Sequence, residues 1–516
     1  MVDTLVSHYK ETLKVNTHPA HKDITVDMDQ LYVPIFFGGI SEVVKSVEEQ
    51  TTHSQLSTYK EFTLLEKKDF LKSFESMLEK AKAQSIDVVG KIFQIGNFAA
   101  AVLDCRGGCL SIDDLHVHLC VPPGAIPEEQ TQQVYIYVTG TSSVENHHFS
   151  TPFVHCGPPD TVFHKDVVLT MPHCVKNTSS CKFSLSKLSS DGSSDKLREG
   201  FDVITVVDND SITFSVNHFC GFGATASPVD GTILKKTMIA CLFIHEDSHS
   251  EDLVRFRLRL VDDVKVNVLE VRTEEERHGF YQADVDSPLI VLKNDQDVVA
   301  KISDCAESWE LSEPERKIHR DLLWRETKAS CARAIPSAMF IAKRRSGCRK
   351  VCFTAHMTVL QEGSGVYGVN FFVYAKKERI QQPALDRETQ MDRIQQMFLE
   401  QMARLQCTSV RPRLLEESIF NKLCDLFDDP NPLGNDWRNL ATLLLNRSVS
   451  TDSISDKAGR ERRSPTEIVF ELFVGRQSGR TEEETRATLM GALIDMDRQD
   501  AEFAIVAIRD SDEIVR

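Results

Sequence analysis

The chain has 516 residues, of which 41% are hydrophobic and 27% are charged, and its formal net charge is −17. This length predicts about three or four domains of ordinary size. The acidic balance argues against nucleic acid as the main partner, because phosphate backbones repel an acidic protein. No apolar segment resembles a signal peptide or reaches the roughly 18 residues of a membrane-spanning helix. The 14 cysteines are thinly spread, which predicts reduced thiols and a cytoplasmic protein, with membrane association through a partner as the alternative.

The first segment, residues 1–97, is predicted to be partly helical. Apolar residues recur at helical spacing over residues 61–81. Such a stripe faces either a core or a partner, and the core is the commoner case. The residues of this stripe are Phe62, Leu65, Phe70, Phe74, Met77 and Leu78.

Strand patterns begin near residue 98. Short alternating or β-branched runs such as CLSIDDLHVHLCVP, DVVLTMP and SITFSVNHF are separated by Gly, Pro, Asn and Asp, which predicts an all-β domain, a sandwich or a barrel, over residues 98–228. A second series predicts another β domain over residues 229–380. Its runs include MIACLFIH, LVRFRLRLV, VNVLEVR and FTAHMTVLQ. The middle of the chain is therefore expected to hold two tandem all-β domains.

Helical patterns return after the second β domain. A stripe from Met391 to Leu405 predicts a helical linker over residues 381–411. Amphipathic segments over residues 412–511 then predict an all-α bundle of six helices. Ser464 before Pro465 and Thr481 before three glutamates are typical helix starts. The predicted core of this bundle contains Leu423, Leu426, Trp437, Leu440, Leu444, Ile468, Phe470 and Leu493.

Several of these stretches resemble a known family of receptors and adaptors. LCDLFDDPNPLGNDWRNLATLL and RSPTEIVFELF resemble the death domain of netrin receptors of the Unc-5 type, with Phe473 where the family has Trp. RGGCLSIDDLHVHLCVPPGAIPEEQTQQVYIYV and VHCGPPDTVFHKDVVLTMPHC resemble a ZU-5 domain. Residues 232–378 occupy the place of the family's UPA domain. The layout resembles that of the netrin-receptor C-like proteins.

The resemblance implies an intracellular signalling adaptor. ZU-5 and the death domain would fold back on UPA, and release would let the death domain recruit other death-domain proteins in apoptotic or NF-κB-type signalling. This implies neither an enzyme nor a cofactor, metal site, nucleic-acid partner or small-molecule substrate. A cytoskeletal scaffold resembling the ZU-5–UPA tandem of ankyrins is a weaker alternative, because no ankyrin repeats are present.

Charged residues of opposite sign on the bundle could form the surfaces through which death domains assemble. A merely solvated surface is an equally good interpretation. The acidic group contains Asp425, Asp428, Asp429 and Asp436, and the basic group contains Arg460, Arg462 and Arg463.

A different function is suggested by the triplet His218-Phe219-Cys220. Some relatives with ZU-5 and UPA domains cut their own backbone at a His-Phe-Ser triplet in this position. Here Cys220 would attack the carbonyl of Phe219, with His218 as base or orienting group, and release a UPA–death-domain fragment. The alternative is a β-strand with a buried, inert thiol. A second triplet, His148-Phe149-Ser150, lies in a predicted loop that would relax the strain such a reaction needs.

Overall fold

The computed structural model describes most of the chain after residue 66. The described residues are 67–83, 87–140, 150–188, 194–199, 202–229, 231–246, 252–293, 296–324, 335–346, 352–362, 368–374, 417–429, 435–445, 449–477 and 480–496, with Leu415, Arg498, Ala501, Phe503, Ala504 and Val506. The predicted linker helix over 381–411 and the residues His148 and Phe149 lie outside this description. No helix within these ranges is both long and apolar enough to cross a membrane.

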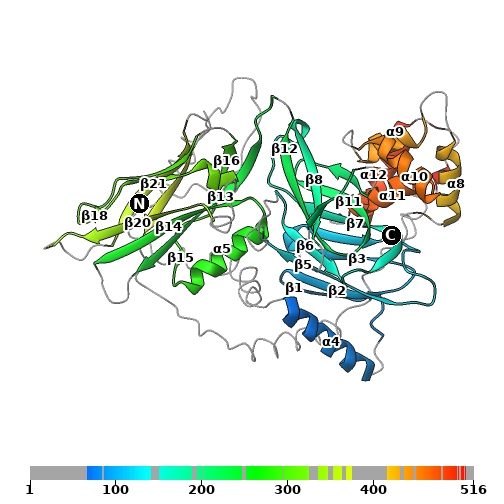
Figure 1. The fold of residues 1–516 in the computed structure, drawn as a ribbon, viewed down its shortest axis with the longest axis horizontal. Helices are drawn as coiled ribbons and strands as arrows, with labels where there is room; N and C mark the ends of the chain where they lie inside the picture. The colour runs from blue at the N-terminus through cyan, green and yellow to red at the C-terminus, as the bar shows by residue number, and fades with distance from the viewer. Residues whose placement is uncertain are drawn as a thin grey trace, which may run out of the picture. The chain divides into compact units, whose positions relative to one another are not determined.

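The first β domain is a sandwich of two antiparallel sheets around one apolar core, as predicted (Figure 1). One sheet has the strand order β1-β2-β5-β6-β12-β8-β9, and the other has the order β10-β11-β7-β4-β3. The strands are β1 (Ile92–Ile95), β2 (Phe98–Leu103), β3 (Gly108–Ile112), β4 (Val117–Val121), β5 (Gln132–Thr139), β6 (Phe153–Gly157), β7 (Val162–Pro172), β8 (Cys181–Leu188), β9 (Ser194–Lys196), β10 (Ile204–Val207), β11 (Ser211–His218) and β12 (Gly221–Pro228).

The helix predicted before this domain is α4 (Lys67–Ala83), and its apolar stripe faces a core. Phe70 stacks on Phe98 of β2 with ring centroids 5.3 Å apart, and Phe74 lies 5.6 Å from Phe93 of β1. The stripe therefore covers the first sheet of the sandwich. The core interpretation is confirmed for the described part of the stripe, which begins after Phe62 and Leu65.

The second β domain also contains two sheets. One has the order β15-β13-β14-β20-β18 with β16 paired to β13, and the other has the order β19-β17-β21-β22. The strands are β13 (Lys235–Glu246), β14 (Leu253–Asp262), β15 (Tyr281–Gln282), β16 (Ser287–Leu292), β17 (Val298–Ser303), β18 (Trp309–Leu311), β19 (Glu315–Ile318), β20 (Ser337–Arg344), β21 (Thr354–Gln361) and β22 (Val369–Tyr374).

The prediction that this domain is all-β is wrong at two places, α5 (Lys265–Arg277) and the short α6 (Arg320–Trp324). The run VNVLEVR, expected as a strand, forms most of the first half of α5. Its β-branched residues favour a strand locally, but contacts with distant residues stabilise the helix. Glu275 is fully buried and accepts hydrogen bonds from Arg257 and Arg259 of β14.

The last described segments form the predicted helical bundle, with α8 (Glu417–Asp428), α9 (Trp437–Leu445), α10 (Thr451–Glu461), α11 (Pro465–Arg476) and α12 (Glu482–Asp495). Ser464 caps α11 by accepting a hydrogen bond from the Glu467 amide, and Thr481 forms a capping box with Glu484. The predicted core residues are buried, apart from the partly buried Leu426. The last predicted helix, in the run DAEFAIVAI (500–508), is described only at Ala501, Phe503, Ala504 and Val506, so the count of six stays a prediction.

The cysteine chemistry differs from the prediction at one pair. Cys109 of β3 and Cys120 of β4 are directly opposite in the strand register and form a disulfide, with Cα atoms 4.2 Å apart. Opposite residues of antiparallel strands lie within reach of such a bond. Cys105, four residues before Cys109, is a free thiol.

Candidate functional site

The outer face of the five-stranded sheet is covered by the helical bundle. Side chains alternate along β7, so Val167 and Leu169 point into the sandwich core while Val168 and Thr170 point the other way. Val168 and Thr170 are nevertheless only 2% and 5% exposed. Helix α11 lies over these residues and contacts β4, β7 and β11 (Figure 1).

Helix α11 is buried between the rest of the bundle and this sheet. Its sequence EIVFELFVG is apolar on nearly all sides, which is typical of a helix with no solvent-exposed face. Its neighbours within the bundle include α8, α9 and α10. Its buried residues are Thr466, Ile468, Val469, Phe470, Leu472, Phe473 and Gly475. The helix therefore forms the centre of an interface between the two domains.

A glycine allows the helix and the sheet to approach closely. A Cβ atom at Gly475 would lie 2.2 Å from Cγ1 of Val168, well inside van der Waals contact. The Thr170 hydroxyl donates a hydrogen bond of 3.2 Å to the carbonyl oxygen of Gly475. Any larger residue at position 475 would push α11 away from β7.

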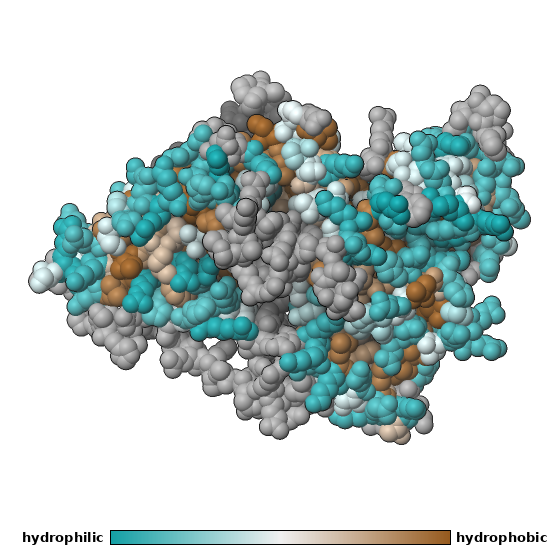
Figure 2. Space-filling model, viewed as in Figure 1, coloured by the Kyte–Doolittle hydropathy of each residue, from teal (hydrophilic) through white to brown (hydrophobic). Residues whose placement is uncertain are grey.

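The apolar core of the bundle continues onto the sheet. Residues on the outer face of the first β domain belong to the same buried cluster as the bundle core, namely Cys120, Val168, Ile204 and Val206. Burial of such apolar area stabilises the contact by about 25 cal/mol per Å². Figure 2 shows that hydrophilic residues predominate on the face of the molecule that it presents, with hydrophobic residues in smaller patches.

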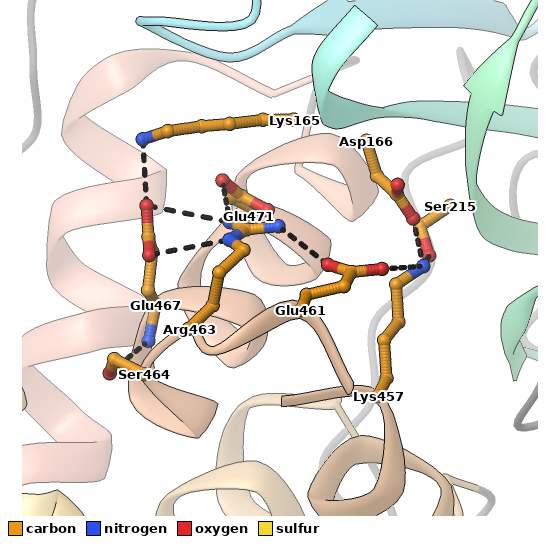
Figure 3. A network of polar contacts seen from close by, with 9 residues as sticks. All are labelled: Lys165, Asp166, Ser215, Lys457, Glu461, Arg463, Ser464, Glu467 and Glu471. Carbon is orange, nitrogen blue, oxygen red and sulfur yellow. Dashed lines mark hydrogen bonds and ion pairs between the residues drawn. The ribbon is translucent and has the colours of Figure 1, made fainter. Parts of the chain in front are cut away.

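Ion pairs join the two domains at three places in the described part of the chain. Lys165 Nζ lies 2.7 Å from Glu467 Oε1, the Lys457 ammonium contacts the Asp166 carboxylate, and Arg476 pairs with Asp208. Figure 3 shows the first two pairs and their neighbours, including Ser215, whose Oγ accepts a hydrogen bond of 3.1 Å from Lys457.

The pair between Arg476 and Asp208 has a fork geometry. Nε of Arg476 lies 2.8 Å from Oδ2 of Asp208, and Nη2 lies 2.5 Å from Oδ1. The same guanidinium donates to the carbonyl oxygen of Leu444 in α9. Two parallel hydrogen bonds fix direction as well as distance, so this pair orients the bundle on the sheet.

Burial shifts the titration of the charges at this interface. Burial lowers the pKa of Lys457 to about 8, while the Asp166 carboxylate in contact with it favours the charged ammonium. Burial also opposes the charge of Glu467, but hydrogen bonding to Lys165 and the nearby Arg463 lower its pKa. Burial raises the pKa of Glu471, which accepts a hydrogen bond from Arg463. These charges depend on one another, so loss of one partner leaves a costly buried group.

The charged residues predicted to contact a partner fall into two sets. Three have partners inside the bundle. Asp436 is 4% exposed and accepts a hydrogen bond from the Arg438 amide. Asp428 accepts a hydrogen bond from Thr466, and Arg463 donates one to Glu471. The remaining four are exposed, and a role in partner binding stays a prediction for them. They are Asp425, Asp429, Arg460 and Arg462.

The triplet His218-Phe219-Cys220 starts at the last residue of β11 and ends directly before β12. Phe219 is fully buried, and its ring packs edge-on against Phe163 at 4.7 Å. Its carbonyl oxygen accepts a hydrogen bond of 3.1 Å from the Asp160 amide. Sγ of Cys220 lies 3.9 Å from Nε2 of His218, and burial raises the pKa of this thiol to about 12. A thiol with so high a pKa is a poor nucleophile at neutral pH.

The residues of the interdomain contact were not found from the sequence. Asp166, Asp208, Lys457, Gly475 and Arg476 lie in different segments, and nothing in their spacing pairs them. One signal was available. The runs DVVLTM and DVITVV are apolar at successive positions, which indicates strands buried on both faces.

Comparison with known proteins identifies the two domains that meet at this interface. A model described as the ZU5 domain matches residues 99–189, and one described as the Death domain matches residues 420–508. Netrin receptor UNC5D of Mus musculus is 22% identical over 382 residues, which are 72% of this chain and 37% of the receptor. UNC5C-like protein of Mus musculus is 34% identical over 93 residues, 17% of this chain and 18% of that protein. Tight junction protein ZO-1 of Rattus norvegicus is 34% identical over 103 residues, 19% of this chain and 6% of that protein.

The chain is thus a modular protein in which a ZU-5 sandwich and a death domain pack together. Both belong to non-enzymatic domain families with roles in signalling. The chain is similar to Unc5-type netrin receptors and spans about a third of the length of the receptor UNC5D. The resemblance seen in the sequence is confirmed for the ZU-5 and death domains. The UPA assignment of the second β domain stays a prediction.

Proposed function

We propose that the chain is a signalling adaptor whose death domain is held inactive against the ZU-5 sheet and, when released, recruits other death-domain proteins. Death domains bind one another through their surfaces, so a covered surface is unavailable to a partner. The proposed output is apoptotic or NF-κB-type signalling. The family resemblance implies a bundle packed on UPA, whereas α11 contacts β4, β7 and β11 of ZU-5.

The observation that carries this proposal is the burial of α10 and α11 against the ZU-5 sheet. Lys457 of α10 is 3% exposed, and its ammonium contacts Asp166 and Ser215 of ZU-5 as well as Glu461 of its own helix. A lysine buried by another domain is typical of a specific contact rather than of a chance approach, because an unpaired buried ammonium is expensive. Release would expose this surface.

A charge exchange across the fork tests the proposal. We expect Arg476→Asp to release the death domain, since it places a carboxylate against Asp208, and truncating such a pair costs about 2–5 kcal/mol. Self-association of the full chain by light scattering should then rise, and amide exchange in the edge strand β10 should accelerate. The double variant Asp208→Arg/Arg476→Asp should restore much of the closed state.

Lys317→Asp is the matched control, because it reverses a charge in an exposed pair with Glu362 of the second β domain. It should leave both measurements at the wild-type value. Equal self-association of the wild type and Arg476→Asp would contradict the proposal.

Self-cleavage at the triplet is the second candidate, favoured by one observation. The Asp160 amide donates to the Phe219 carbonyl and polarises it for attack. In this reaction Cys220 Sγ bonds to the carbonyl carbon of Phe219, the peptide C–N bond breaks, and the amine of Cys220 is freed. Water then hydrolyses the thioester.

A denaturing gel of the full chain distinguishes this candidate from the first. Cleavage would give fragments of 219 and 297 residues that Cys220→Ala abolishes. We expect one intact band over several hours at pH 7.5, because little thiolate forms at a pKa of about 12. Accumulation of the two fragments would overturn this expectation and support the cleavage function.

A further inference from the structure

The disulfide between Cys109 and Cys120 lies on the face of the ZU-5 sheet that the death domain covers. The two residues are opposite one another on β3 and β4, so their side chains share one face. Cys120 is 5% exposed and belongs to the apolar cluster of the bundle, and Cys109 packs against the same cluster. The bond is therefore part of the interdomain contact.

A cavity of about 350 Å³ lies between the two domains at this bond. Its walls include both cysteines with Lys165 and Val168 from ZU-5, and Phe420 and Phe470 from the death domain. A volume of this size is at the lower end of the range for small-molecule sites. A cavity of this volume has room for a small thiol beside the two cysteines that line it.

We propose that Cys109 and Cys120 form a redox modification site, in which a small thiol enters the cavity and reduces the disulfide, and that the reduced pair holds the death domain less tightly. The coupling to release rests on the closed state proposed above. The disulfide itself does not, because the strand register alone places Cys109 opposite Cys120. The substrate class is the low-molecular-weight thiols, with their disulfides as the oxidants of the reverse reaction.

The exchange is balanced with these reactants alone. The thiolate of one small thiol attacks one sulfur of the pair, the S–S bond breaks, and the other cysteine leaves as a thiolate that takes a proton from solvent. A second small thiol resolves the mixed disulfide, giving two cysteine thiols and one small disulfide. Oxidation is the reverse of these steps.

Two physical effects link reduction to docking. The mixed disulfide places a small molecule in the cavity beside Phe420 and Phe470 of the death domain. After it is resolved, the two thiols separate from bonding distance to van der Waals distance, which moves Cys120 within the cluster it shares with Val168. Val168 is the residue on which Gly475 rests, and close-packed contacts tolerate such shifts poorly.

The test uses the full chain in buffers with graded ratios of reduced to oxidised glutathione. Free thiols are trapped by alkylation and the peptides with Cys109 and Cys120 are measured by mass spectrometry, while amide exchange of β10 reports docking. We expect the two cysteines to change state together and β10 exchange to accelerate at least about fivefold on reduction. Cysteines that are alkylated equally in oxidising and reducing buffers would overturn the redox site.

Two variants separate the redox site from the proposed function. The double variant Cys109→Ser/Cys120→Ser should lose the glutathione response of β10, whereas Cys352→Ser, at an exposed free cysteine, should keep it. A pair that changes state with no change at β10 would overturn the link to docking. If amide exchange in β10 were also unchanged by Arg476→Asp, the result would contradict the proposed closed state instead.

Discussion

Replacing Gly475 with alanine is expected to release the death domain from the ZU-5 sheet while the bundle stays folded. The new Cβ would lie 2.2 Å from Cγ1 and 2.7 Å from Cβ of Val168, and a strand backbone cannot yield by that amount without loss of its pairing. Overpacking costs typically about 1–3 kcal/mol. Within the helix itself alanine is favoured over glycine by about 0.5–1 kcal/mol. Faster amide exchange in β10, unchanged exchange in α9 and stronger self-association would report this outcome.

Gly491 provides a matched control for this substitution. It lies in α12, and a Cβ atom there would meet nothing within 4 Å. Gly491→Ala should therefore raise the melting temperature of the bundle and leave the interface closed. Adding Val168→Ala to Gly475→Ala removes the nearest methyl group and should restore part of the closed state. A closed full chain with Gly475→Ala would mean that α11 does not rest on β7 as described.

The sandwich and the bundle could be predicted from local patterns. The alternating run SITFSVNHF contains β11, and α11 and α12 begin after the predicted caps Ser464 and Thr481. The run VNVLEVR was misread because its β-branched residues favour a strand, whereas a buried Glu275 that pairs with Arg257 and Arg259 fixes it as a helix. That pairing joins distant segments, and no local pattern encodes it.

The interface between the death domain and the ZU-5 sheet could not be predicted from local patterns, because its residues also come from distant segments. Asp166 and Lys457 are 291 residues apart, and Asp208 and Arg476 are 268 apart. Each of these residues looks like an ordinary surface charge in its own segment. The acidic and basic groups of the bundle stand out in the sequence by their opposite charge, and three of their members also form hydrogen bonds within the bundle. The sequence does indicate that β7 and β10 are buried on both faces. Such strands need a covering layer, but the pattern does not show which segment supplies it.

Removing the ammonium of Lys457 is the second change expected to have a large effect. Lys457→Met keeps the length of the side chain but leaves the Asp166 carboxylate, 4% exposed, without its cation. An uncompensated buried charge costs about 3–5 kcal/mol, so the closed state should be lost. Light scattering and β10 exchange of the full chain measure this, and unchanged exchange in α9 would show that the bundle is intact.

The double variant Asp166→Val/Lys457→Met separates the role of the pair from the role of the surface. Replacing a buried ion pair by apolar residues of similar volume is often neutral or stabilising, so the double variant should close again. Recovery should be within about 1 kcal/mol of the wild type, because Ser215 also loses the hydrogen bond it receives from Lys457. A double variant as open as Lys457→Met would show that the charges themselves hold the domains together. Recovery would instead show that the apolar contact supplies the affinity, and that the buried pair serves to make this orientation of the death domain more favourable than others.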